Sequence, residues 1–123
     1  MKTVISLALV AALAAGSANA ACTYPKAPEK IPDGGTATLE EMIAAQRGVK
    51  QFDADITAYQ SCLETEFNDA MSKETSLTEE QKKERRKIVD QKMNAAVDEA
   101  QGLADRLNAQ IRVYKEKAAA KKN

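Results

Sequence analysis

Histidine and tryptophan are absent from this chain, and aromatic residues make up only 4% of its 123 positions. Without histidine there is no histidine-dependent triad, no histidine-liganded zinc and little general-base chemistry near neutral pH. Carboxylate and lysine chemistry stay open, but no Gly-rich or turn-borne segment arranges such groups into a site. The sequence therefore predicts a protein that is not an enzyme, with no catalytic residues, no cofactor and no metal site.

An excess of charge of one sign is also lacking, because 18 basic residues balance 18 acidic residues. Such a chain has no bulk electrostatic attraction to nucleic acid or to an anionic membrane. One basic run, Lys82–Lys87, resembles a nucleic-acid patch, but Glu79, Glu80 and Glu84 interleave with it at helical spacings. This pattern is typical of a solvated helix face whose charges pair with one another. We therefore expect no nucleic-acid partner.

No apolar run is long enough to cross a bilayer, which needs about 20 residues. The uncharged run Thr3–Ala15 follows Lys2 and leads to small residues at Ala18 and Ala20. This order is typical of a secretory signal, so we predict a signal peptide at residues 1–20. Cleavage after Ala20 would leave a periplasmic or secreted protein with no integral membrane span in its mature chain.

Two alternatives to a cleaved leader stay open. The leader could serve as a membrane anchor, although its apolar run is short for that purpose. Alternatively Cys22 could carry a lipid, although Asn19 stands where such signals usually have leucine. The mass of the mature protein distinguishes a lipidated Cys22 from a bridged one.

Cysteine is scarce, with only Cys22 and Cys62 in the chain. An even pair in an exported protein most simply forms one disulfide, whereas redox-active pairs usually have the close spacing of Cys-x-x-Cys. Closing a loop of this size contributes roughly 4 kcal/mol in the chain-entropy model. We therefore predict a structural Cys22–Cys62 disulfide.

Proline occurs only in the segment 21–35. Prolines spaced every three or four residues favour an extended polyproline conformation. Pro32-Asp33-Gly34 is a turn signature, because proline fixes φ and glycine tolerates positive φ. The sequence thus predicts an extended arm that ends in a turn.

Two later segments, at about residues 37–73 and about 77–119, carry apolar residues at alternating steps of three and four, which marks one helix face. Each segment begins with residues at capping-box spacing. These are Thr38 with Glu41 in the first, and either Ser76 with Glu79 or Thr78 with Gln81 in the second. The apolar positions are Met42, Ala45, Val49, Phe52, Ile56, Tyr59 and Leu63, then Val89, Met93, Ala96, Ala100, Leu103, Leu107, Ile111 and Tyr114.

Two long stripes joined by a short link predict an all-α fold, a long coiled-coil-like antiparallel two-helix hairpin that forms one domain at residues 21–123. The arm is about as long as the first helix up to Cys62. A disulfide would therefore staple the arm back along that helix, with Tyr24 and Ile31 on the hairpin. Folding the chain about residue 75 sets Gly48 opposite Gly102, as a close backbone approach or as tolerated surface glycines.

Methionine is common on adaptable binding surfaces. Met42 and Met93 are therefore candidates for an interaction surface, together with Tyr24 on the arm. Because both methionines lie on the apolar stripes, packing in the core is the alternative role.

Several short segments in the first half of the mature chain combine into a pattern. They are Cys22-Thr23-Tyr24-Pro25, Ile31-Pro32-Asp33-Gly34, Glu41-Met42 with Ala45-Gln46, and Tyr59 to Cys62-Leu63-Glu64. The pattern resembles an uncharacterised family of small exported Gram-negative proteins. This resemblance implies no activity, but it supports the pairing of Cys22 with Cys62.

The segment Leu77-Thr78-Glu79-Glu80-Gln81 is similar to the Leu-Thr-x-x-Gln motif of the Spy/CpxP periplasmic chaperones. That similarity implies a small helical protein that dimerises into a cradle for unfolding clients. The motif occurs once here, and the arm and the cysteine pair depart from that family's pattern.

The sequence favours an exported non-enzymatic protein that binds an unidentified envelope protein or itself, as a homodimer. A two-helix core with one extended cover leaves apolar edges that a second copy would bury. The first alternative is a client-binding chaperone of envelope stress, and an enzyme of unrecognised type comes third.

Overall fold

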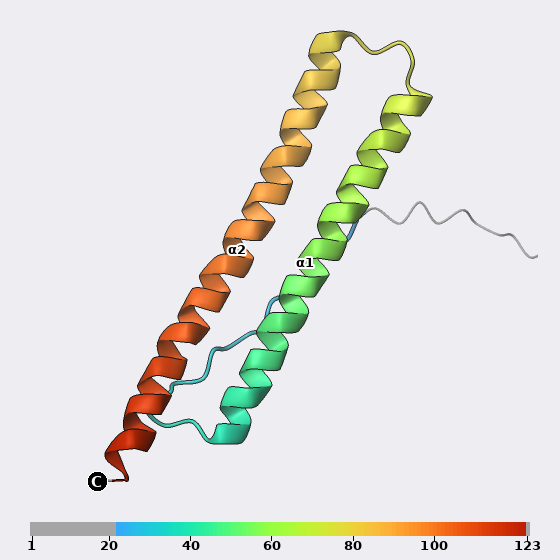
Figure 1. Cartoon of the computed structure of the whole chain (residues 1–123). Coiled ribbons are helices and arrows are strands. Elements are labelled where there is room, and N and C mark those ends of the chain that lie inside the picture. Colours follow the sequence, from blue (N-terminus) through green and yellow to red (C-terminus); the bar gives the residue numbers. More distant parts are fainter. Residues whose placement is uncertain (1–21, 123) are drawn as a thin grey trace, which may run out of the picture.

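The computed structural model describes residues 22–122 as two long antiparallel helices lying side by side (Figure 1). Helix α1 spans Leu39–Lys73 and helix α2 spans Glu79–Ala120. The described residues contain no strand. The predicted all-α hairpin is therefore confirmed, whereas the predicted signal peptide at 1–20 lies outside the described residues. Neither described helix is long and apolar enough to cross a membrane.

Both helices begin with a complete capping box. In α1 the Thr38 hydroxyl accepts the Glu41 backbone N–H at 3.2 Å, and the Glu41 carboxylate accepts the Thr38 N–H at 2.7 Å. In α2 the same pair of bonds joins Thr78 and Gln81 at 3.2 and 2.9 Å. Of the two predicted starts for α2, Thr78 with Gln81 is thus the one that forms. The caps satisfy backbone donors that a helix leaves unpaired at its first turn.

The core lies along the seam between the helices and follows the predicted stripes. Phe52 and Ile56 of α1 each expose only 2% of their surface, and Ala96 of α2 exposes none. On α2 the small residues Ala96 and Ala100 are buried together with the larger Leu103 and Leu107. The buried cluster comprises Val49, Phe52, Ile56, Ala96, Ala100, Leu103 and Leu107.

The Pro-rich arm forms a third element against the helical pair. Its start is fixed by the Cys22–Cys62 disulfide, with the two Cα atoms 5.7 Å apart. Farther along, Ala27 and Ile31 pack on the buried cluster. Figure 1 shows the arm passing behind α1 toward the C-terminal part of α2. The stapled arm and the position of Ile31 on the hairpin are as predicted.

The turn at the end of the arm contacts α2. The Asp33 carbonyl accepts the N–H groups of Thr36 at 3.1 Å and Ala37 at 2.8 Å. The Asp33 carboxylate also accepts the Gly35 N–H at 2.8 Å. Gly34 is buried and donates its N–H to Gln110 Oε1 at 2.9 Å. The turn therefore fixes the arm to α2, and not only to α1.

The described glycines resolve two points that the sequence leaves open. No described glycine has a positive φ, so the turn at Gly34 does not depend on left-handed backbone geometry. Gly48 and Gly102 also do not mark a close approach of the helices. A Cβ at Gly48 would meet Pro28 of the arm at 3.6 Å, and a Cβ at Gly102 would meet nothing within 4 Å. Gly48 faces the arm and Gly102 faces solvent.

Candidate functional site: two apolar grooves on the hairpin

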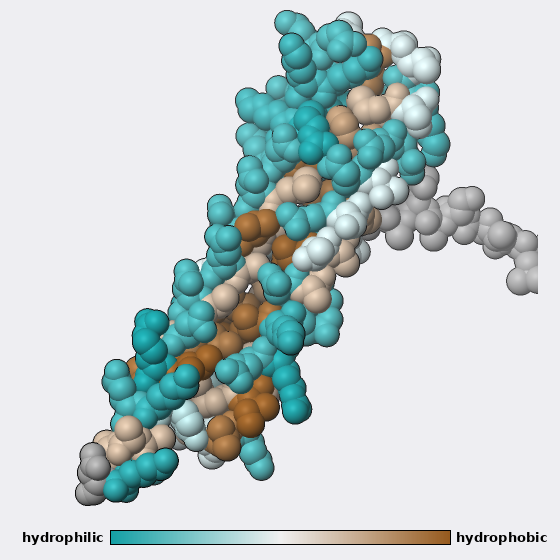
Figure 2. Space-filling view, in the orientation of Figure 1, coloured by the Kyte–Doolittle hydropathy of each residue, from teal (hydrophilic) through white to brown (hydrophobic). Residues whose placement is uncertain are grey.

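The first groove lies on the seam beside the helix ends farthest from the interhelical loop. It has a volume of about 650 Å³. Ile43 stands at its edge with 37% of its surface exposed. Figure 2 shows apolar side chains along the seam between the helices, bordered by hydrophilic ones. We call this the open groove; its lining is Ile43, Gln46, Arg47, Val49, Lys50, Asp53, Ala100, Ala104, Leu107, Asn108 and Ile111.

None of the residues that line the open groove belongs to the arm. Its polar border on α1 carries both signs of charge, from Arg47, Lys50 and Asp53. All three residues are exposed, and within the described chain none of their charged groups takes part in an ion pair. The open groove thus combines an apolar floor with charges that form no ion pair within residues 22–122.

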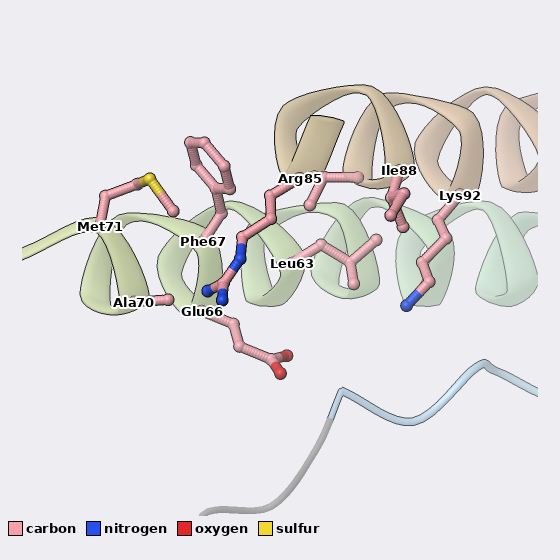
Figure 3. Close-up of a pocket in the computed structure, with 9 residues that line it drawn as sticks. Leu63, Glu66, Phe67, Ala70, Met71, Arg85, Ile88 and Lys92 are labelled. Atoms are coloured by element: carbon pink, nitrogen blue, oxygen red, sulfur yellow. The ribbon is translucent and has the colours of Figure 1, made fainter. Parts of the chain in front are cut away.

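The second groove, here the loop-end pocket, lies on the same seam near the interhelical loop and has a volume of about 290 Å³. Its charged residues are Glu66, Arg85 and Lys92. Figure 3 shows the Arg85 and Lys92 side chains reaching from α2 toward α1 on either side of Leu63. The apolar lining is Leu63, Phe67, Ala70, Met71, Ile88 and Val89.

Arg86 joins the two helices near the loop-end pocket. Its guanidinium donates to both carboxylate oxygens of Glu64, at 2.7 and 3.0 Å, and lies 2.9 Å from Asp90. It also lies 5.2 Å from the centre of the Phe67 ring, which adds a cation–π contact. Hydrogen bonds to Glu64 and then to Asp90 raise the pKa of Arg86 above its ordinary value.

The sequence predicts that the basic residues of Lys82–Lys87 pair with acidic residues on the same helix face. The structure shows this for only some of them. Lys82 pairs with Glu79 at 3.0 Å, as expected for a solvated face. Arg85 instead pairs with Glu74, beyond the end of α1, at 2.7 Å. With Arg86 bound to α1 as well, two of the five cations hold the loop end of the hairpin together.

Tyr24 connects the arm to both helices. Its ring packs edge-on against Tyr59 of α1, with the ring centres 5.1 Å apart. Its hydroxyl donates a hydrogen bond to Glu99 of α2. Partial burial, followed by the hydrogen bond to Glu99, raises the pKa of Tyr24 from 10.0 to about 12.

The three residues predicted for an interaction surface do not form one together. Met42 is buried with 4% of its surface exposed, and therefore packs in the interior of the hairpin. Met93 is half-buried on α2. Tyr24 is 41% exposed, but its ring and hydroxyl contact the protein's own helices.

Sequence reasoning predicted apolar edges on the hairpin but did not identify the residues that line either groove. The signal that could have found them is the set of apolar residues adjacent to the heptad stripes. Ile43 follows Met42, and Ile88 precedes Val89, so each helix carries an apolar side chain beside its core face. Residues beside the core stripe in a two-helix fold have no third helix to cover them and stay partly exposed, as Ile88 does at 44%.

Within residues 22–122, no charged or polar side chain is fully buried. In the part of the chain that the structure describes, one cluster brings potential metal-ligand atoms close together, and it joins Cys22, Cys62 and Glu66. Because those cysteines form a disulfide, they offer no thiolate ligand. What the described geometry offers a partner is therefore apolar surface edged with charge.

Comparison of the chain with protein-family models, curated proteins and solved structures finds no match. The functional argument therefore rests on the two grooves.

Proposed function

We propose that this protein is an exported, non-catalytic binding protein whose working form is a homodimer joined through the open groove. The observation that carries the proposal is the apolar floor of that groove, which the arm does not cover. The helical hairpin has two sides, and the arm packs along only one stretch of its seam. A second hairpin on the open groove would complete a four-helix arrangement, the common way for helices to bury a remaining apolar face.

The charges on α1 favour a second copy as the occupant. A symmetric dimer requires a surface that is complementary to itself. Lys50 and Asp53 lie about one helical turn apart on the border of the open groove. A two-fold axis passing between them sets Lys50 of each copy against Asp53 of the other. The balance of 18 basic and 18 acidic residues adds no long-range repulsion between copies.

Sedimentation equilibrium of the purified, oxidised mature protein over a range of concentrations tests the dimer. Ile43→Glu places a charge on the edge of the open groove and should shift the protein to monomer. Val113→Glu is the matched control, because Val113 is 39% exposed but does not line the groove. A wild-type protein that stays monomeric at high micromolar concentration would contradict the proposal.

A charge swap separates a specific interface from general loss of solubility. Lys50→Asp alone should weaken the dimer, because it sets two carboxylates against each other. Adding Asp53→Lys to the same chain restores opposite charges and should restore the dimer. Circular dichroism establishes that each variant keeps its helix content. Equal association of the single and double variants would place the interface elsewhere.

A client-binding chaperone is the second candidate, favoured by the presence of two separate apolar grooves on so small a protein. Flexible Met71 lines one of them and would adapt to varied apolar segments. The test is whether the oxidised protein suppresses aggregation of reduced insulin at a near-stoichiometric ratio. Suppression that Ile43→Glu or Ile88→Glu weakens supports this function, and the absence of suppression rejects it.

A further inference from the structure

We infer that the loop-end pocket binds a single acyl chain that carries an anionic headgroup. The pocket is separate from the open groove, since the two share no lining residue. The inference therefore does not rest on the proposed dimer.

The residues that line the loop-end pocket determine which kind of ligand fits it. Six of the nine residues are apolar, and none of the six side chains bears a hydrogen-bonding group suited to a polar ligand. Its volume of about 290 Å³ is at the small end of ligand pockets. A helix with its side chains is about 10–12 Å wide and is too bulky for such a space. A flexible hydrocarbon chain is narrow enough to lie along it.

The arm shows that an extended apolar segment can pack along the seam between the helices. Ala27 and Ile31 of the arm pack on the core between the helices. The arm's described course begins at Cys22, whose sulfur lies 3.1 Å from Glu66 at the edge of the loop-end pocket. The disulfide to Cys62 fixes that position. The pocket is the continuation of the seam beyond Cys22, where no described residue of the arm lies.

The charged side chains that line the loop-end pocket favour an anionic headgroup. Arg85 and Lys92 lie on its α2 side, and Glu66 is its one acidic residue. The Arg85 guanidinium is already paired with Glu74. Lys92 has no side-chain partner within the described residues. Figure 3 shows the Lys92 side chain crossing from α2 toward α1 beside Leu63, on the side where the arm begins. An anionic headgroup at this end of the pocket would gain the contact that Lys92 lacks.

Isothermal titration of the oxidised mature protein with monomeric dodecanoate tests the inference. We expect saturable binding of one molecule per chain. Dodecyltrimethylammonium, with the same chain and the opposite charge, should bind about tenfold more weakly, as should dodecanoate to Lys92→Glu. Lys115→Glu makes the same charge change at an exposed position far from the pocket and should leave binding unchanged. Equal binding of both amphiphiles would overturn the anionic specificity.

A second variant locates the ligand. Ala70→Trp fills the pocket from its α1 wall and should abolish binding while circular dichroism shows the helices intact. Binding should persist in Ile43→Glu, whose change lies at the open groove. Loss of binding in Ile43→Glu with retention in Ala70→Trp would assign the acyl chain to the open groove and overturn the inference. Absence of any saturable heat with wild-type protein would overturn it as well.

Discussion

Gly34 donates its backbone N–H to Gln110 Oε1 at 2.9 Å, and this hydrogen bond joins residues 76 positions apart. The backbone of the turn lies so close to α2 that a side chain at Gly34 would overlap the Gln110 carbonyl oxygen. It would also lie 2.8 Å from the Tyr114 nitrogen. The arm is thus held at two ends, by the disulfide at one and by this contact at the other.

Gly34→Ala should lower the free energy of unfolding by about 1–3 kcal/mol, because the added methyl group meets backbone atoms that cannot move aside easily. Urea denaturation measures the change. Gly102→Ala is the control, since its Cβ would enter open space in a helix. That control should raise stability by about 1 kcal/mol. A neutral result for Gly34→Ala would mean that the turn does not pack on α2 in solution.

Replacing both Cys22 and Cys62 by serine should lower the free energy of unfolding by roughly 4 kcal/mol, because the unfolded chain regains the freedom of the closed loop. The arm should also loosen, since its start is no longer fixed. Limited digestion with trypsin detects this change through faster cleavage after Lys26 and Lys30. Reduced wild-type protein should behave like the double variant. Unchanged cleavage would show that packing alone holds the arm.

Tyr24→Phe should change how stability depends on pH. The folded-state pKa of Tyr24 is about 12, against 10.0 ordinarily, because burial and Glu99 disfavour the phenolate. The phenol's contribution is fully present below pH 10 and is lost as the pH rises toward 12. Between pH 10 and 12 the free energy of unfolding should therefore fall more steeply with pH for wild type than for Tyr24→Phe. Parallel curves would mean that Tyr24 titrates normally.

The pair Arg86 and Glu64 should show favourable coupling in a double-mutant cycle with Arg86→Met and Glu64→Gln. Nη1 of Arg86 contacts both Glu64 oxygens, a charge-assisted bond that favours measurable coupling, and the partial exposure of both groups keeps the coupling small. The fully solvated pair Lys26 and Glu29 is the comparison and should show less. Hydrogen exchange of Arg86→Met should increase at the loop end of the hairpin. Equal coupling in the two pairs would reject the helix-joining role of Arg86.

Local patterns in the sequence were sufficient to predict the helices. Thr38 and Thr78 each stand three residues before a side chain that completes a capping box. The heptad positions around Phe52 and Ala96 are the buried ones. These features depend on neighbours within a few residues, so one sequence contains all the information needed to recognise them.

Contacts between distant residues could not be predicted in the same way. No periodic pattern in the sequence indicates these contacts. They are the hydrogen bonds from Gly34 to Gln110, from Tyr24 to Glu99 and from Arg86 to Glu64. They depend on where the arm and the helices lie after packing. The two grooves could not be predicted for the same reason. Whether an apolar residue beside a heptad stripe is covered depends on where the Pro-rich arm packs.

The disulfide between Cys22 and Cys62 also determines how the protein would transmit mechanical tension. A force pulling on the chain at Cys22 and at the end of α2 would pass through the sulfur–sulfur bond directly into α1 at Cys62. The backbone of residues 23–61 lies outside this covalent path, and that part of the chain would resist extension only through its contacts with α2, such as Gly34 with Gln110. Extension would therefore require α2 to separate from both α1 and the arm, and the backbone of residues 23–61 would be stretched only after the bond is reduced.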